Sequence, residues 1–194
     1  SWEGYKRFPI NRQKELNPMN EVLTALNAAQ HSEIQVDPVP QALLDEIMEA
    51  GLYAASGMDR QKTIILCLTD PDVIADFPRA NAQIAGYKEG TDPFYGPAVL
   101  VVLSPKEVPT ALYDGSLVLG NLMTAAHALG LGSCWIHRAY EEFKQPVWQE
   151  FLRQLGLKGD YIGIGHCVIG YPDEHPEASP RRSGRIFYVG KEKR

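Results

Sequence analysis

The sequence predicts an α+β domain in which helices flank a central mixed sheet of four to five strands. Four apolar runs recur with helical spacers between them, at 63–69, 98–103, 133–137 and 161–170. A fifth run, 185–189, has strand character and is expected to add at a sheet edge. With 194 residues, 44% of them hydrophobic and 22% charged, the chain is expected to form one domain with a sizeable core.

The first part of the chain predicts an arm followed by two helices. Residues 1–18 have little apolar content and no clear period, so they are expected to form an N-terminal arm that is either flexible or of non-native origin. A short helix is predicted at 19–29. A clearer one is predicted at 40–51, which starts with proline, carries an apolar face and ends at Gly51.

The segment 115–130 predicts a central helix, because it is apolar on nearly every side. Its polar residues Asn121, Thr124 and His127 are spaced three apart and therefore follow one narrow stripe. The reading favoured is that they satisfy polar groups inside the core. A dimer interface and a contact with a cofactor stay open as alternatives.

Charge and cysteine content exclude several classes of protein. The net charge of -5 and the pI near 5.5 give no reason to expect nucleic acid or a membrane surface as partner. No apolar run approaches membrane-spanning length, and residues 1–12 do not resemble a signal peptide. Three cysteines without C-x-x-C spacing favour neither disulfides nor zinc, so we expect no metal and a reducing, cytoplasmic location.

Two other motifs carry little weight. The glycine-rich run 163–170 lacks G-x-G-x-x-G spacing and lies in a predicted strand, which argues against a dinucleotide-binding loop. His137 and His166 each lie near a cysteine, which raises a metal site or a Cys–His nucleophile pair as possibilities. Because no third orienting group stands at a recognisable spacing, core roles are favoured for both.

The stretch 50–63, AGLYAASGMDRQKT, has the form of a binding loop. Small residues and Gly57 at a helix-to-strand junction let backbone N–H groups approach a flat or anionic ligand. A plain turn between helix and strand would show the same residues, so both readings stay open at this point.

Four segments carry a resemblance to a known family. They are EAGLYAASGMDRQ at 49–61, DPFYGPAVLVVL at 92–103, DGSLVLGNLMTAAHALGLGSCWIHRA at 114–139 and GIGHCVIGYP at 163–172. Together they make the chain resemble the nitroreductase family of FMN-dependent flavoproteins over residues 19–189. The resemblance implies a three-layer fold, an intertwined homodimer with FMN at its interface, and one domain at 19–194 whose C-terminal arm, 176–194, extends onto the partner.

The resemblance also implies which residues contact the cofactor. The loop residues Ser56, Gly57 and Gln61, with Asp59 in place of the usual Asn, would lie against the flavin of the other subunit. One face of the ring would be covered by the W-I-H-R segment, with a backbone N–H of its last two residues pointing toward N5; the segment consists of Trp135, Ile136, His137 and Arg138. Asn81 is expected at the pyrimidine edge.

The chain departs from the family pattern where arginines normally hold the FMN phosphate. In place of R-R-S-x-R it has AAQHSEI at 28–34, with His31 as the remaining candidate contact, and no Arg or Lys occurs from Glu15 to Asp59. Glu33 even brings a negative charge toward the phosphate position. Compensation is expected from the C-terminal arginines Arg181, Arg182 and Arg185; Arg60 and Lys62 are further candidates.

Three functions fit these observations, in decreasing order of preference. The first is a reductase that passes hydride from NADH or NADPH through FMN N5 to a nitroaromatic, quinone or similar small conjugated acceptor. The second is a flavin-free or flavin-poor dimer that acts as a binding protein, which the missing arginines favour. The third is specialised chemistry such as reductive dehalogenation or flavin breakdown. No catalytic side chain is expected, because the flavin performs the hydride chemistry and water can supply the proton.

Overall fold

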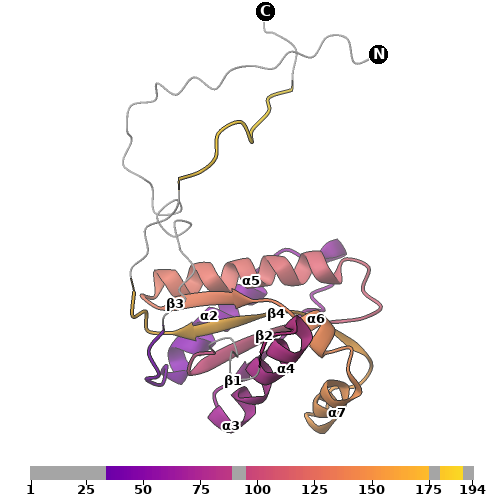
Figure 1. Cartoon of the computed structure of the whole chain (residues 1–194). Helices are drawn as coiled ribbons and strands as arrows, with labels where there is room; N and C mark the ends of the chain where they lie inside the picture. The colour runs from indigo at the N-terminus through magenta and orange to yellow at the C-terminus, as the bar shows by residue number, and fades with distance from the viewer. Residues whose placement is uncertain (1–33, 89–94, 175–179, 190–194) are drawn as a thin grey trace, which may run out of the picture.

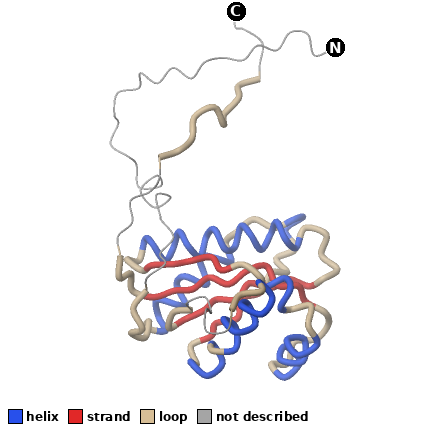
Figure 2. Tube along the Cα trace, viewed as in Figure 1, coloured by secondary structure: helices blue, strands red, loops and turns tan. Residues whose placement is uncertain are grey.

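The computed structural model describes residues 34–88, 95–174 and 180–189, and within them helices flank one four-stranded sheet (Figures 1 and 2). The strands are β1 (Ile64–Leu68), β2 (Ala98–Pro105), β3 (Gly132–Ile136) and β4 (Tyr161–Gly170). The helices are α2 (Gln41–Leu52), α3 (Pro71–Ile74), α4 (Asp76–Ala85), α5 (Ala111–Ala128), α6 (Ala139–Glu142) and α7 (Pro146–Gln154). All four predicted apolar runs are strands, and the helix predicted at 40–51 is α2. The N-terminal arm and the helix predicted at 19–29 lie outside the described residues.

The strand order is β1-β2-β4-β3, and every pair of neighbours among these strands is antiparallel. The expectation of a mixed sheet was therefore wrong for the described strands. β2 and β3 run in the same direction and are joined through α5, as in a parallel unit. β4 nevertheless inserts between them, and each of its ladders is antiparallel.

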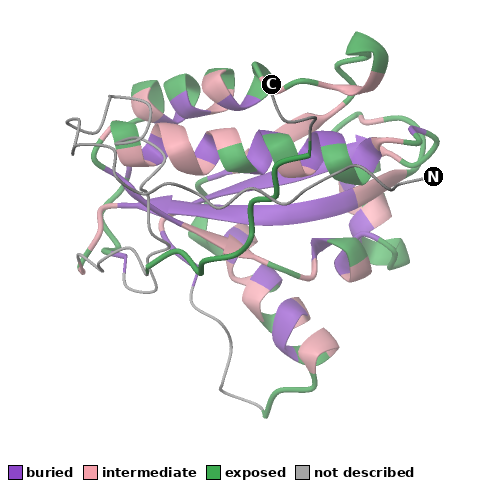
Figure 3. Ribbon diagram, turned by 90° about the horizontal axis from the view of Figure 1, so that it is seen from above, coloured by how far each residue is buried: buried purple, intermediate pink, exposed green. Residues whose placement is uncertain are grey.

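Two helical layers bury the two faces of the sheet, which gives the three-layer fold (Figure 3). The α2 and α5 side forms one apolar cluster, and the α3, α4, α6 and α7 side forms the other. Central strand β2 is buried over seven of its eight positions. That continuous burial explains why its sequence is apolar without alternation.

α5 begins at Ala111, four residues before the apolar segment, and packs against α2. The two helices approach so closely that a Cβ on Gly51 would lie 2.5 Å from Leu122 Cδ2. Two residues of the polar stripe make backbone contacts: Asn121 Nδ2 donates to the Ala50 carbonyl at 3.1 Å, and Thr124 Oγ1 donates to the Gly120 carbonyl at 2.9 Å. These two side chains therefore form hydrogen bonds with backbone carbonyl groups, which is one of the roles expected for the stripe.

The segment 185–189 is not a strand. Residues 180–189 are exposed along their length and lie apart from the sheet in Figure 1, where they form the yellow segment near the C-terminus. Their large side chains stay open to solvent, with Ile186 61% and Val189 68% exposed. An edge strand needs a neighbouring strand to pair with, and no described edge of this chain's own sheet meets this segment.

Candidate functional site

The loop between α2 and β1 is built around one buried carboxylate. Asp114, in the first turns of α5 and 6% exposed, accepts the Gly57 N–H on Oδ1 at 3.0 Å. Its Oδ2 accepts the Thr110 hydroxyl at 2.8 Å. Within the loop, Ser56 Oγ accepts the Gln61 N–H at 3.0 Å. The loop is thereby closed on itself and fixed to the start of α5.

Three residues of this loop hold a backbone conformation that side chains normally avoid. Met58, Asp59 and Gln61 have φ of 56°, 52° and 49°, in the left-handed region. Each such residue costs on the order of 1–3 kcal/mol and persists only where surrounding contacts enforce it. Here the Asp114 and Ser56 hydrogen bonds do so, together with a 2.8 Å bond from Gln61 Nε2 to Asp59 Oδ1. Strain of this kind concentrates at functional sites.

Gly57 is required by space. A Cβ at this position would lie 2.4 Å from Thr110 Oγ1 and 2.8 Å from its Cγ2. Any larger residue would push the loop away from α5 and break the bond from the Gly57 N–H to Asp114. Glycine at position 57 therefore lets the backbone of the loop approach the start of α5 closely.

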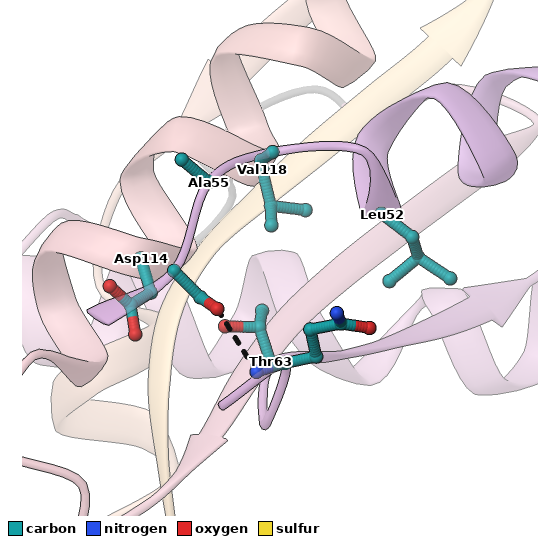
Figure 4. Close-up of a pocket in the computed structure, with 8 residues that line it drawn as sticks. Leu52, Ala55, Thr63, Asp114 and Val118 are labelled. Carbon is teal, nitrogen blue, oxygen red and sulfur yellow. Dashed lines mark hydrogen bonds between the residues drawn. The ribbon is translucent and has the colours of Figure 1, made fainter. Parts of the chain in front are cut away.

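Two adjoining cavities open beside the loop and share Leu52, Ala54, Ala55 and Gln61 as lining residues. The first has a volume of about 190 Å³ and is surrounded by Leu52, Ala55, Thr63, Asp114 and Val118 in Figure 4, with Ser56 also lining it. The second has a volume of about 350 Å³ and adds Glu49, Tyr53 and Asp59. The Thr63 hydroxyl is buried without a hydrogen-bond partner, so the first cavity offers an uncommitted polar group beside apolar walls.

The cavities carry negative charge and lack positive charge. Their lining includes the carboxylates of Glu49, Asp59 and Asp114, and no Lys or Arg is among the lining residues. Arg60, in the same loop, places Nη2 3.1 Å from Met58 Sδ. Within one chain this site suits a neutral ring better than a phosphate.

The W-I-H-R segment leaves the sheet at the end of β3. Trp135 packs against Gly165 of β4 so closely that a Cβ there would lie 2.4 Å from the indole Nε1. β4 carries a bulge at this level, where Val102 pairs with Gly165 but Leu103 pairs with Gly163. The chain then turns at Arg138, whose φ of 93° is again unusual for a residue with a side chain. Arg138 forms a half-exposed ion pair with Glu141 at 3.0 Å.

Asn81 contacts the backbone of the W-I-H-R segment, and its expected contact with the pyrimidine edge stays a prediction. Its side chain is buried on α4, and Nδ2 donates to the backbone carbonyl of His137 at 2.6 Å. Asn81 therefore connects α4 to the backbone of the W-I-H-R segment. His166 is a fully buried core residue, as the favoured reading had it, with Nε2 2.8 Å from the Glu142 carboxylate.

The loop and the W-I-H-R segment lie at the same end of the sheet but on opposite edges of it. The loop leads into β1 and the segment follows β3, and these are the two outer strands. Three strand spacings of about 4.8 Å separate them, roughly 15 Å in all. One chain therefore does not bring the two sets of expected flavin contacts together in one place.

The C-terminal arginines also stand apart from the loop. Arg181, Arg182 and Arg185 lie in the exposed segment 180–189, away from the sheet (Figure 1). His31 lies outside the described residues. The contacts expected of these four residues with a phosphate stay predictions.

Sequence reasoning missed the residues that hold the loop in place. Asp114 is an acid directly before the apolar segment 115–130, and its isolation there was the one available signal. Thr110 and Thr63 carried no signal, because their roles depend on contacts between residues far apart in the chain.

Comparison with known proteins decides the family. The sequence profile of the nitroreductase family matches residues 35–171, which is more than half of the chain. The chain belongs to the nitroreductase family. A protein of Methanothermobacter thermautotrophicus, named as a candidate NADH dehydrogenase/NAD(P)H nitroreductase, is 25% identical over 143 residues, covering 71% of this chain and 70% of that protein.

Solved structures confirm the nitroreductase fold of this chain. A nitroreductase with bound FMN from Bacteroides fragilis superposes with a TM-score of 0.77 at 21% identity, covering 88% of this chain and 100% of that one. A nitroreductase with bound FMN from Desulfitobacterium hafniense gives 0.78 at 22% identity, covering 89% and 100%. An iodotyrosine deiodinase bound to FMN and 3-iodo-L-tyrosine gives 0.65 at 19% identity, covering 84% and 96%.

Two further properties concern the described residues only. None of their helices has the length and apolar character needed to cross a lipid bilayer. No group of three or more His, Cys, Asp or Glu side chains among them is arranged to hold a metal ion.

Proposed function

We propose that this protein is an FMN-dependent oxidoreductase that uses NADH or NADPH to reduce a small conjugated acceptor, such as a nitroaromatic compound or a quinone. Membership of the nitroreductase family supports the reaction class. The Bacteroides and Desulfitobacterium structures hold FMN, and the Methanothermobacter relative is named for NAD(P)H, which supports the choice of cofactor and donor.

The observation that carries the proposal is the strained loop beside the two cavities. A flavin ring needs a flat apolar wall and a few fixed polar groups at its edges. Leu52, Ala54 and Ala55 supply the wall, while Gln61 and the unpartnered Thr63 hydroxyl supply polar groups. The site therefore fits the ring portion of FMN.

The phosphate portion requires cations that one chain does not bring to this loop. A homodimer in which the arm of one chain reaches the site of the other would supply Arg181, Arg182 and Arg185. It would also place the W-I-H-R segment of one chain opposite the loop of its partner, which removes the separation across the sheet. The exposed apolar side of α5, with Leu112 54% and Tyr113 71% exposed, supports such an assembly.

FMN, when bound, supplies the two-electron hydride chemistry at N5. The role of the chain is to position the cofactor and to exclude water from it. The hydrogen-bonded loop would hold one edge of the ring, Trp135 and its neighbours would limit solvent on one face, and the other face would be left for donor and acceptor in turn. The described residues need supply no side-chain acid, since water can deliver the proton.

The decisive experiment is the visible spectrum of the full chain before and after FMN is added and unbound flavin is removed by gel filtration. We expect retained flavin near one FMN per chain, and rapid bleaching on anaerobic addition of NADH or NADPH. Retained flavin that neither donor bleaches would overturn the donor assignment. The location we propose is the cytoplasm, which the three free thiols support.

A second function is favoured by one observation, the absence of Arg and Lys from Glu15 to Asp59 together with the acidic cavity lining. On that reading the dimer binds another planar ligand and does not hold FMN. A colourless protein that refuses FMN in the same gel-filtration experiment would establish this alternative over the first.

A further inference from the structure

A buried polar network lies directly behind the W-I-H-R segment, and the reaction described above makes no use of it. The buried network consists of Asn81 on α4, Tyr95 before β2, Glu142 on α6 and His166 on β4. His166 and Glu142 are fully buried, Asn81 is 4% exposed and Tyr95 is 9% exposed. Polar groups so deeply buried are costly unless each finds a partner.

The contacts of the buried network form one continuous chain. Glu142 Oε2 lies 2.8 Å from His166 Nε2, and His166 Nδ1 lies 3.2 Å from the Tyr95 hydroxyl. Asn81 Nδ2 lies 3.4 Å from the same hydroxyl and donates to the His137 carbonyl at 2.6 Å. A carboxyl group in the core is thus connected, through contacts of three side chains, to one backbone carbonyl of the W-I-H-R segment.

Hydrogen bonds connect one part of this network. Asn81 Nδ2 donates to the Tyr95 oxygen, and the Tyr95 hydroxyl shares a hydrogen bond with His166 Nδ1. His166 Nε2 and both Glu142 carboxylate oxygens are buried without a hydrogen-bond partner, so the carboxylate and the imidazole are in close contact but are not joined by a hydrogen bond. Burial, and then the charge of Glu142, raise the pKa of Tyr95, so the phenol keeps the proton that it donates.

The backbone that this chain reaches lies between the end of β3 and α6. Arg138 has a φ of 93°, and α6, which follows at once, is only four residues long. α6 packs tightly on β4, where Ala139 is fully buried against Gly163. The Arg138–Glu141 ion pair is half exposed and therefore contributes little. The bond from Asn81 to the His137 carbonyl adds a contact from α4 to this backbone.

We propose that the buried network positions the backbone of residues 137–138, so that their N–H groups are held at the edge where the cofactor is bound. A core ion pair alone adds little net stability and can be replaced by apolar residues. Its value here is geometric, because α4, α6, β4 and the segment before β2 are linked by contacts that reach the His137 carbonyl through Asn81. The flavin part of this inference rests on the proposed function, whereas the backbone part does not.

The test uses Tyr95→Phe, which cuts the chain in its middle and keeps the aromatic ring. Ser104→Ala is the control, because it removes a buried hydroxyl from β2, and Ser104 Oγ has no hydrogen-bond partner. Amide hydrogen exchange of the full chain without flavin is followed by mass spectrometry. We expect exchange of the Glu142 and Phe143 amides, which donate to the carbonyls of Arg138 and Ala139, to rise at least about tenfold in Tyr95→Phe alone, while exchange in α5 stays unchanged.

A second measurement connects the backbone to the cofactor. With FMN bound, anaerobic bleaching at saturating donor should slow about tenfold in Tyr95→Phe and stay unchanged in Ser104→Ala. Unchanged exchange of the Glu142 and Phe143 amides would overturn the inference, whatever the flavin does. Faster exchange with an unchanged bleaching rate would overturn the flavin part. A wild-type chain that binds no FMN, yet shows the exchange effect, would overturn the proposed function and leave the backbone role supported.

Discussion

At the residue scale, Asp114 connects the loop to the rest of the fold. Asp114→Ala removes the acceptor for the Gly57 N–H and the Thr110 hydroxyl, so we expect the free energy of unfolding to fall by about 1–3 kcal/mol. Asp114→Asn keeps one carbonyl oxygen and should lose less. Urea denaturation of both variants measures this difference. Equal losses would mean that the carboxylate's hydrogen bonds do not hold the loop.

Gly57 gives the second prediction at this scale. Because a Cβ would meet Thr110 at 2.4 Å, Gly57→Ala should destabilise the fold by about 1–3 kcal/mol through overpacking. Adding Thr110→Ala removes the clash, so the double variant should cost less than the sum of the two single variants. Thermal unfolding of the four proteins makes the comparison, and strict additivity would contradict the steric explanation.

The sequence identified the loop but not what holds it. The small residues and Gly57 at a helix-to-strand junction have a local meaning, whereas Ser56 and Gln61 were named through the resemblance to the family. Asp114 and Thr110 could not be named, because their role arises only when α5 packs across the loop. The contact of Asn81 with the His137 carbonyl also depends on tertiary packing, and its expected contact with the ring edge stays a prediction.

At the element scale, β4 contains a thiol that should make stability depend on pH. Burial raises the pKa of Cys167 far above its ordinary value of about 9.0, so the folded state keeps the proton that the unfolded state loses at alkaline pH. Stability from this group is therefore complete below pH about 9 and falls above it, by about 1.4 kcal/mol per pH unit.

The comparison with Cys167→Ala isolates this effect. The variant is less stable at pH 7 because of the cavity it leaves, but its stability should fall less steeply above pH 9. Cys67 and Cys134, whose pKa values are also raised by burial, are present in both proteins and so cancel. Denaturant titrations between pH 7 and 10.5 provide the two curves. Parallel curves would show that Cys167 is ionised to the same extent in both states.

The positions of the helices and strands could be predicted from the sequence better than any other feature of this protein. β1 to β4 and α2 follow from apolar runs, periodicity and punctuation, which are local properties of the chain. Strand direction was predicted wrongly, because the insertion of β4 between β2 and β3 depends on long-range pairing. The segment 185–189 has the residues of a strand, yet strand formation also needs an edge to pair with.

At the scale of the whole molecule, the proposed function would need two chains to complete the site, because the loop and the W-I-H-R segment lie on opposite edges of the sheet. The cavity lining supplies no cation, so we propose that the phosphate of FMN is bound by positive charge from the partner chain. The arm at 180–189 combines arginines with exposed apolar side chains, which is the composition of a segment that docks on a protein surface and reaches an anion.

Replacing two of these arginines tests that arrangement. Arg181→Ala with Arg182→Ala should weaken FMN binding by about 1.5–3 kcal/mol, as expected for hydrogen bonds to a charged group, measured by flavin fluorescence titration. Arg79→Ala with Arg153→Ala changes the net charge equally but removes only exposed ion pairs with Asp76 and Glu150, so FMN affinity should hardly change. Equal losses of FMN affinity in the two double variants would show that the arm acts only through its net positive charge. Unchanged affinity in the first pair would remove Arg181 and Arg182 from the phosphate site and direct attention to Arg60 and Lys62.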